Sequence, residues 1–554
     1  MAKKDIFYVF TELLHYTESR QFFSANVKKR RGMDTFIATL PIIVLVWSMT
    51  KERPWPAHIA LPLTALFIGF LQLFYFQGRA PELAANTIAG LLSVLTPLSI
   101  VAGAILLNSI LVRSGSQEKL RHYLESVSSN KVAQLMIIGW AFTFMLEGAS
   151  GFGTPAAIAA PILVGLGFPA LRVALLTLVM NTIPVSFGAV GTPTWFGFEA
   201  LNLSEETLLE VSSLTAFIHF VAGFFIPLLA LKFVVGWRDI RANAVFIFIS
   251  VLSCTVPYLL LAQVNYEFPA LIGGAIGLSL SIAFAKFGVG LKRVNHTSTN
   301  LKKESSLENI VVGLSPFIIM IVILVITRVQ QLGVKPLLNN TEVWFQLFDI
   351  EVSKALIVSW NDILGTTISW SYKTLYVPAL IPFIVTIVLL IPFLKVSFFE
   401  LRQAVSETGE RIKHPAIALV GALIMVNFMM QGGESSPMFI IANNLADATG
   451  ENWLYVASLL GALGSFFSGS ATVSNLTFGG IQYGIAEQAQ LSVPLVLSLQ
   501  SVGAAMGNMV CINNIIAVSA ILGIKNQEGK MIKQTIKPML VFALIAGILS
   551  QVMR

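Results

Sequence analysis

The sequence predicts an all-α protein that passes through a membrane many times. Hydrophobic residues make up 55% of the 554 residues and charged residues only 12%, and the mean hydropathy is +0.77. Soluble domains carry about 25% charged residues. Stretches of about 20 apolar residues recur along the chain, and each is long enough to span a bilayer as a helix. We therefore expect a polytopic fold of about 12–14 transmembrane helices.

Each expected span is a long apolar stretch with polar or charged residues at its ends. In chain order, the spans are predicted near residues 34–50, 57–76, 86–112, 132–146, 173–190, 212–234, 244–263, 268–287, 309–328, 375–395, 415–431, 453–468, 492–510 and 534–552. Three further apolar stretches, at 152–168, 472–486 and 513–524, are short or interrupted by Gly, Pro or Asn. Such stretches are typical of half-helices or re-entrant hairpins.

Polar segments divide the chain into four parts. Residues 1–32 mix aromatic residues with charges and predict a basic amphipathic segment on the membrane surface. Residues 33–240 are expected to form a first transmembrane repeat and residues 309–554 a second one. Residues 241–308 then supply connecting helices and a basic linker between the two repeats.

The charges and aromatic residues indicate where the loops lie. The chain has 36 Lys and Arg against 29 Asp and Glu, and the basic residues gather in loops. This pattern is typical of the cytoplasmic loops of a multi-pass protein in the cell membrane, and it does not indicate a nucleic-acid surface. The polar stretch 329–374 contains Trp344, Trp360 and Trp370 and predicts a loop at the membrane–water interface.

Several motifs that would indicate other chemistry are absent from the sequence. There is no Walker A loop, no His-Glu-x-x-His and no pair of Cys-x-x-Cys motifs. The two cysteines, Cys254 and Cys511, fall inside apolar stretches and are expected to be buried thiols. The sequence therefore predicts no ATP-driven step, no metal site and no cofactor.

A single acidic residue marks the most informative stretch. Between Lys131 and Arg172 the only charged residue is Glu147, and Gly, Ser, Thr and Pro follow it closely. A charged side chain inside a membrane costs roughly 2.5–3.5 kcal/mol on insertion scales, so such a residue is a functional candidate. Backbone groups freed by the helix breakers must face protein or a watery cavity. These features predict a binding site inside a transporter.

The two halves of the chain contain similar interruptions. In the region 147–193, the break that begins at Glu147 is followed by a second one at Asn181. In the region 465–515, a break near Gly469 is followed by another that begins at Gln500. Within each half, about 30 residues separate the two breaks. Paired interruptions at matching places in two halves indicate inverted repeats with the binding site between them.

The breaks supply groups that suit a small hydroxy acid. Helix N-termini there offer backbone N–H groups to a carboxylate. Hydroxyl and amide side chains can bond both carboxylate and hydroxyl groups. The candidate substrate-binding residues are Ser150, Gly151, Gly153, Thr154, Asn181, Thr182, Ser186, Ser470, Thr472, Ser474, Asn475, Gln500, Asn508 and Asn513. The alternative is that these small residues only allow close helix packing.

The titratable residues leave alternatives open. Glu147 can carry a proton, help to hold sodium, or have a purely structural position in a vestibule or beside a basic residue. Glu434, in Gln-Gly-Gly-Glu-Ser-Ser-Pro, is a second candidate carboxylate or a helix-end residue at the interface. His219, inside an apolar stretch, either bonds a neighbouring helix or relays protons. We take Glu147 as the expected proton-coupling residue.

One short motif is shared with enzymes. Gly148-Ala149-Ser150-Gly151 matches the Gly-x-Ser-Gly around the nucleophile of rhomboid-type intramembrane serine proteases, and His219 would then be the base. A four-residue match in Gly- and Ser-rich membrane sequence is frequent by chance, and rhomboids have far fewer spans. The protease is therefore a distant alternative, and we expect no enzyme activity.

Longer motifs resemble those of a known family. The stretch from Glu147 to Phe168 and the stretch Asn181–Pro193 closely resemble the bacterial L-lactate permease family. Gly469-Ser-Ala-Thr-Val-Ser-Asn and Gly503-Ala-Ala-Met-Gly-Asn-Met agree with its C-terminal half. The resemblance extends from the first span to the C-terminus.

The resemblance implies a function and a mechanism. It implies proton-coupled symport of L-lactate, with glycolate and related 2-hydroxy monocarboxylates as alternatives, across a bacterial cell membrane. A sodium-coupled organic anion transporter of the same fold is a further alternative. The family's placement among ion-transporter-like folds implies inverted repeats, re-entrant hairpins and an elevator-type movement. Some relatives carry an acidic residue at the position of Ala471, and its absence here increases the importance of Glu147.

Overall fold

The fold is that of a helical membrane protein. The computed structural model describes residues 32–49, 51, 55–151, 154–292, 307–328, 332–377, 380–525 and 527–554. Among these residues, nine helices are long and apolar enough to cross a membrane, and up to eleven if each of two bent pairs is one span. The polytopic helical fold is confirmed. The expected N-terminal amphipathic segment lies outside the described residues, apart from Gly32.

The expected number of 12–14 spans is too high by this measure. One predicted span, near 375–395, is an apolar helix of 14 residues, Leu380–Phe393. Another predicted span, near 453–468, is a helix of 16 residues. Apolar stretches of this length suit half-helices and buried core helices better than complete spans.

In the first half of the chain, the regular elements of the described residues are all helices. They are Gly32–Met49, α2 (Ala57–Phe74), α3 (Ala80–Ser93), α4 (Leu95–Arg113), α5 (Ser116–Ser126), α6 (Lys131–Gln134), η1 (Leu135–Phe142), α7 (Thr143–Ser150), α8 (Thr154–Gly165), α9 (Ala170–Met180), η2 (Ile183–Phe187), α10 (Gly188–Trp195), η3 (Glu199–Leu201), α11 (Glu205–Ala222), α12 (Ile226–Val234), α13 (Trp237–Ala242), α14 (Ala244–Ala262) and α15 (Pro269–Lys286).

The second half contains both helices and strands. They are α16 (Leu307–Arg328), α17 (Val334–Leu338), β1 (Val343–Leu347), β2 (Ile350–Ser353), β3 (Ile357–Trp360), η5 (Ile363–Gly365), β4 (Trp370–Lys373), α18 (Leu380–Phe393), α19 (Phe398–Met430), η6 (Gly433–Ser435), α20 (Pro437–Thr449), η7 (Gly450–Asn452), α21 (Trp453–Ser468), α22 (Ala471–Gln488), α23 (Val493–Gly507), α24 (Ile512–Ile521) and α25 (Glu528–Val552).

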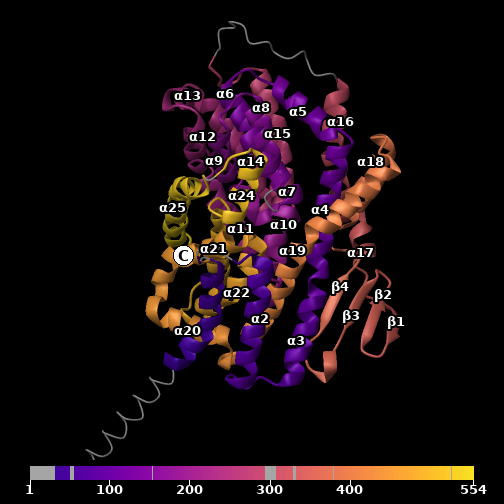
Figure 1. Cartoon of the computed structure of the whole chain (residues 1–554), viewed down its shortest axis with the longest axis vertical. Coiled ribbons are helices and arrows are strands. Elements are labelled where there is room, and N and C mark those ends of the chain that lie inside the picture. The colour runs from indigo at the N-terminus through magenta and orange to yellow at the C-terminus, as the bar shows by residue number, and fades with distance from the viewer. Residues whose placement is uncertain are drawn as a thin grey trace, which may run out of the picture.

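The expectation of an all-α chain is wrong for residues 343–373. These residues form a four-stranded antiparallel sheet in the order β1-β2-β3-β4, at one edge of the molecule beside α3 (Figure 1). The segment was expected to be a loop because its strands are only 4–5 residues long. Strands this short carry little periodic signal.

The helices form two groups that meet at the candidate site. In one group, α19 packs against α2, α3 and α4, and α16 packs against α5 and α18. In the other, α7 packs against α15, and α22 packs against α20, α21 and α23. Figure 1 shows α3, α4 and α18 on one side of the molecule and α9, α12 and α25 on the other. Contacts of α4 with α7 and α10 join the two groups.

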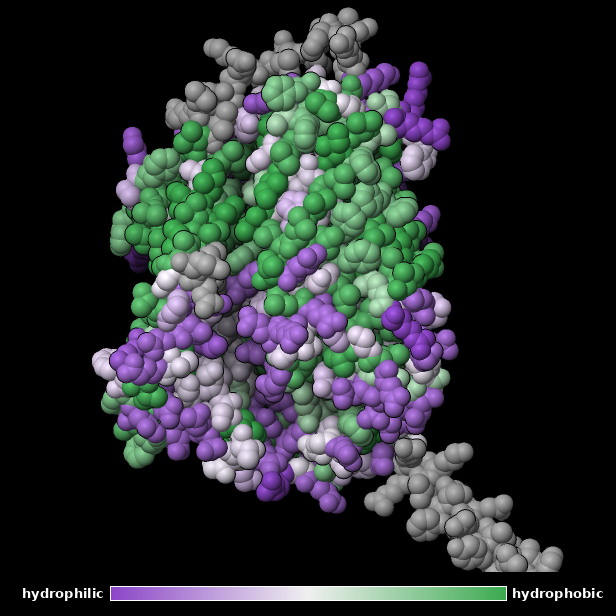
Figure 2. Space-filling model, turned by 180° about the vertical axis from the view of Figure 1, so that it is seen from behind, coloured by the Kyte–Doolittle hydropathy of each residue, from purple (hydrophilic) through white to green (hydrophobic). Residues whose placement is uncertain are grey.

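Small residues allow the helices that carry the site to approach closely. Gly148 of α7 lies against the backbone of Ala270 and Leu271 in α15, where a side chain would collide. Gly274 of α15 is pressed in the same way against the backbone of Met145. Close approach through small residues is typical of membrane helix packing. On the outside, one face has a broad hydrophobic area, and hydrophilic residues gather below it (Figure 2).

Candidate binding site at the broken helices

The first break lies where Glu147 was predicted to mark one. α7 ends at Ser150, Gly151 follows with φ 58°, and α8 begins at Thr154. A positive φ favours glycine because a Cβ is strained there. Gly153 lies outside the described residues, and for Thr154 only the backbone is described.

Glu147 is buried and bonded to the start of the next break. Its side chain is 2% exposed, and the Nδ2 of Asn181 donates to its Oε2 over 2.9 Å. Asn181 follows the last residue of α9, and its own Oδ1 is buried with no hydrogen-bond partner among the described residues. No basic side chain pairs with Glu147 in the described part of the chain. This carboxyl group therefore has a donor but no neutralising charge.

A strained left-handed turn lies against the same carboxyl group. Gly188 lies so close that a Cβ on it would come 2.5 Å from Oε1 of Glu147. Ala189, Val190 and Gly191 follow with φ of 44°, 56° and 72°. A β-branched residue at positive φ is a genuine outlier, and such strain is typical of functional sites.

Two side chains hold the left-handed turn in place. The Oγ1 of Thr192 donates to the carbonyl of Ala189 over 2.5 Å, and the Nε1 of Trp195 donates to the carbonyl of Val190 over 3.0 Å. Ala189 also contacts the first break, because a Cβ on Gly151 would come 3.0 Å from its Cβ. The two breaks of the first half are thus one structural unit.

The first break of the second half has the same plan. α21 ends at Ser468, Gly469 adopts φ 73°, and α22 begins at Ala471. The Oγ of Ser470 accepts from the backbone N–H of Val473 over 3.3 Å and so caps α22. The remaining N–H groups of this first turn lie next to the break, where an anion can be bound.

Hydrogen bonds connect the breaks of the two halves. The Nδ2 of Asn475 donates to the carbonyl of Pro193 over 2.8 Å. The Oγ of Ser186 donates to the carbonyl of Ser501 over 3.1 Å, and the Oγ of Ser501 donates back to it over 3.0 Å. The predicted binding residues around Glu147 and around Ser470 therefore belong to one polar region.

Gln500 organises the second half of this region. Its Nε2 lies 3.2 Å from the Oγ of Ser474 and 3.3 Å from the Oδ1 of Asn475. Its Oε1 accepts from the Nε2 of Gln482 over 3.0 Å. Gln482 in turn accepts from the Nε1 of Trp453 over 2.7 Å. Neither Gln482 nor Trp453 was among the candidates, although Gln482 is an amide in an apolar stretch.

The other predicted residues are spread around the breaks. Thr182 bonds the carbonyl of Leu178 over 3.3 Å, and Thr472 is buried in the first turn of α22. Asn508 accepts from the Nδ2 of Asn514 over 2.6 Å. Asn513 is exposed beside Gly469.

Ser150 faces a different space from Glu147. It lines a narrow cavity of about 30 Å³ between the two groups of helices. Asn108 of α4 and Gln117 of α5 contribute amide side chains to the same wall. The sequence prediction missed both, although Asn108 is a lone amide inside an apolar span. Glu267, a second buried carboxyl residue, was also missed and lies against Gly191.

The arrangement does not support the serine protease. His219 is buried and its Nε2 lies 2.9 Å from the Oγ of Ser186, not of Ser150. The Oγ of Ser150 instead donates to the carbonyl of Leu146 over 3.0 Å. The expected bond of His219 to a neighbouring helix is therefore what the structure shows. Glu434, the other candidate carboxylate, is exposed in η6.

Comparison with known proteins agrees with the resemblance of the motifs. The family model of L-lactate permease matches residues 34–554. The chain belongs to this family. It is 52% identical over 522 residues to the putative L-lactate permease of Haemophilus influenzae, with 93% of this chain and 98% of that protein covered. The family consists of permeases, so the chain is a multi-pass transporter of the bacterial cell membrane and not an enzyme.

More distant relatives show the range of the family. The L-lactate permease of Escherichia coli K12 is 24% identical over 536 residues, covering 94% of this chain and 95% of that protein. The glycolate permease GlcA of the same strain is 25% identical over 546 residues with the same coverage. The solved structure of Neisseria gonorrhoeae MtrF aligns with a TM-score of 0.44 at 15% identity, over 91% of this chain and 96% of that chain.

Proposed function

We propose that this permease takes up L-lactate, or glycolate and related small 2-hydroxy monocarboxylates, together with a proton that Glu147 carries. The substrate class is supported by the relatives named for L-lactate and for glycolate. The coupling is supported by one observation, the burial of Glu147 beside Asn181 without a basic partner among the described residues. Burying an unpaired ionised carboxylate costs far more free energy than burying its neutral form.

The substrate is proposed to bind between the paired breaks. Its carboxylate would be held by backbone N–H groups at the start of α22, next to Gly469. Its hydroxyl would be bonded by Asn or Ser side chains such as Asn475, which reaches across to Pro193. The Oδ1 of Asn181, which is buried and has no partner in the part of the chain that the structure describes, is a further acceptor for a hydroxyl group.

The movement that exposes the site to each side is proposed to be of the elevator type. The broken helices belong to the group that contains α7–α15 and α20–α24, and α2–α5 with α16–α19 form the other group. The cavity at Ser150 lies along the boundary between these groups. A boundary that already contains empty space allows one group to slide past the other. In this proposal, the two halves of the chain are inverted repeats that build the moving part together.

Uptake into proteoliposomes tests the coupling. One proton and one monocarboxylate anion carry no net charge, so an inward pH gradient should accelerate uptake while membrane voltage has little effect. Glu147→Gln should abolish gradient-driven uptake and retain lactate counterflow, since exchange does not require release of the proton. Glu434→Gln is the matched control, because that carboxyl group is exposed and should leave uptake unchanged.

Two outcomes would contradict the proposal. Acceleration by a sodium gradient, with no response to the pH gradient, would assign the coupling to sodium. Normal pH-driven uptake by Glu147→Gln would remove Glu147 as the proton carrier. A panel of lactate, glycolate and longer 2-hydroxy acids in the same vesicles decides which substrate is preferred.

A further inference from the structure

The four-stranded sheet has two faces of different chemistry. In the register of the strands, Phe345 pairs with Val352, Val352 with Val358, and Val358 with Tyr372. Neighbours across a sheet point to the same side, and side chains alternate along each strand. One face, which we call the apolar face, therefore carries Phe345, Leu347, Ile350, Val352, Val358, Trp360, Trp370 and Tyr372. The opposite face carries Gln346, Glu351, Ser353, Ile357, Ser359, Ser371 and Lys373, most of which are polar.

Only half of the apolar face is covered by the rest of the protein. Trp360 and Trp370 pack onto the group formed by Ala85, Ala89 and Ile363, and the hydroxyl of Tyr372 lies 2.7 Å from the Oγ of Ser99. These contacts cover β3 and β4, which lie along α3 and α4.

The other half of the apolar face extends beyond the helices. Phe345 and Leu347 of β1 are 53% and 54% exposed, and Ile350 of β2 is 37% exposed. Phe348, at the tip of the hairpin between β1 and β2, is 87% exposed. In Figure 1, β1 and β2 are the strands farthest from α3. We call this exposed half, with the hairpin tip, the overhang.

The length of the underlying helix places the sheet at a membrane boundary. α3 and α4 form a 34-residue span, Ala80–Arg113, which is about 51 Å long at 1.5 Å per residue. The hydrocarbon layer takes only about 20 residues, so its far boundary, counted from Arg113, lies at about residue 93. The residues of this span that contact the sheet lie between Ala85 and Ser99. They therefore lie on both sides of the membrane boundary near residue 93.

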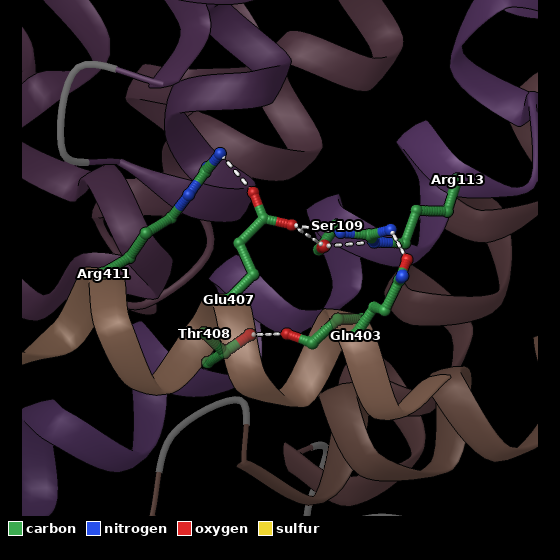
Figure 3. A network of polar contacts seen from close by, with 7 residues as sticks. Ser109, Arg113, Gln403, Glu407, Thr408 and Arg411 are labelled. Atoms are coloured by element: carbon green, nitrogen blue, oxygen red, sulfur yellow. Dashed lines mark hydrogen bonds and ion pairs between the residues drawn. The ribbon is translucent and has the colours of Figure 1, made fainter. Parts of the chain in front are cut away.

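Charged side chains define the Arg113 end of this span, from which the residues were counted. Figure 3 shows Arg113 of α4 beside Glu407 of α19, and Glu407 also accepts from Ser109 over 2.7 Å and pairs with Arg411. A cluster of three charged side chains is not stable in hydrocarbon. It therefore marks the opposite boundary of the membrane.

We infer that the overhang rests on the lipid bilayer, with its apolar side chains in the membrane–water interface. Trp residues concentrate at this depth, and Trp344 of β1 is 70% exposed. The same span also carries exposed apolar side chains, since Leu91 is 48% and Leu95 is 42% exposed. The opposite polar face of the sheet then faces water. The sheet would fix the tilt and depth of α3–α4 in the bilayer.

Spin labels on the full chain in lipid nanodiscs test this inference. Labels are placed singly by Phe345→Cys and Leu347→Cys on the overhang, after Cys254→Ala and Cys511→Ala remove the native thiols. Gln346→Cys and Glu351→Cys, on the opposite face of the same two strands, are matched controls. All four positions are on the sheet surface, and retained substrate uptake by the labelled chains shows that they are folded.

The measurement compares collisions with oxygen, which concentrates in lipid, and with a water-soluble nickel chelate. At residues 345 and 347 we expect oxygen collisions to exceed nickel collisions several-fold, and at residues 346 and 351 we expect the reverse. Equal access of nickel to both faces would overturn the inference. Protection of residue 347 from both reagents, together with dipolar broadening between two labelled chains, would assign the overhang to a second copy and also overturn it.

Discussion

Glu147 and Asn181 are 34 positions apart in the chain, and the amide of Asn181 donates a 2.9 Å hydrogen bond to the carboxyl group of Glu147. Each residue lies at an interruption of its own helix, so the bond ties two breaks of the first half together. Gly188 packs against the same carboxyl group so closely that position 188 has no room for a side chain. The contacts of this region and of the helices around it are expected to respond to substitution in four ways.

Asn181→Leu should impair uptake, because it removes the hydrogen-bond donor to the buried carboxyl group of Glu147. Loss of a buried partner costs about 1–3 kcal/mol, and about 1.4 kcal/mol corresponds to a factor of ten. The maximal rate of uptake should therefore fall about 10-fold. The initial rate of uptake into proteoliposomes measures the effect. An unchanged rate would show that the bond between Asn181 and Glu147 is unimportant for transport.

Gly188→Ala should inactivate transport without unfolding the chain. The added Cβ would lie 2.5 Å from Oε1 of Glu147, so the carboxyl group must move. A displacement of this kind commonly costs about 100-fold in function. Gly409→Ala is the control, because no described atom lies within 4 Å of a Cβ at that position. Alanine is also more favourable than glycine inside a helix, by about 1 kcal/mol. Equal uptake by both variants would show that the contact at Gly188 is unimportant.

Ser186→Ala should destabilise the contact between the two halves of the chain. It removes the partner of His219 and the bond to the carbonyl of Ser501, both in a buried position. Loss of a buried partner costs about 1–3 kcal/mol. Thermal unfolding in detergent should show a lower Tm, while Ser279→Ala, whose exposed hydroxyl bonds only its own helix, should leave Tm unchanged. Equal Tm values in the two variants would contradict the bridging role.

Glu407→Gln should loosen the pairing of α4 with α19. The substitution removes the charge that faces Arg113 and Arg411 (Figure 3). Because these side chains are partly exposed, the expected loss is small, about 0.2–1 kcal/mol, and it should shrink at high salt. Glu410→Gln, which breaks a more exposed pair within α19, is the control. If Tm falls equally in both variants, Glu407 does not stabilise the pairing of α4 with α19 more than an exposed ion pair does.

Part of the candidate site could be predicted from local sequence. Gly151 and Gly469 lie at helix ends with positive φ, as the runs of Gly, Ser and Pro indicated. Glu147 is buried, as expected for a carboxyl residue inside a long apolar stretch. These features depend on residue type and near neighbours alone, because chain stiffness and the cost of burying charge are local properties.

The partners of the same residues could not be predicted. His219 was considered as a partner for Ser150 and is found on Ser186. The amide of Asn475 bonds the carbonyl of Pro193, 282 positions away. Such pairs depend on which helix faces lie together, and the sequence of one helix does not contain that information.

The sequence by itself determined that this chain is a polytopic membrane protein with paired breaks and a lone buried carboxyl residue in the first of them. Hydrophobicity and helix breakers act over one span, so composition and order are sufficient for those conclusions. Only the tertiary structure decided that Asn181 and Gly188 enclose Glu147, and that residues 343–373 form a sheet on α3. Packing of distant segments fixes these contacts, because each side chain takes the partner that the whole fold places beside it.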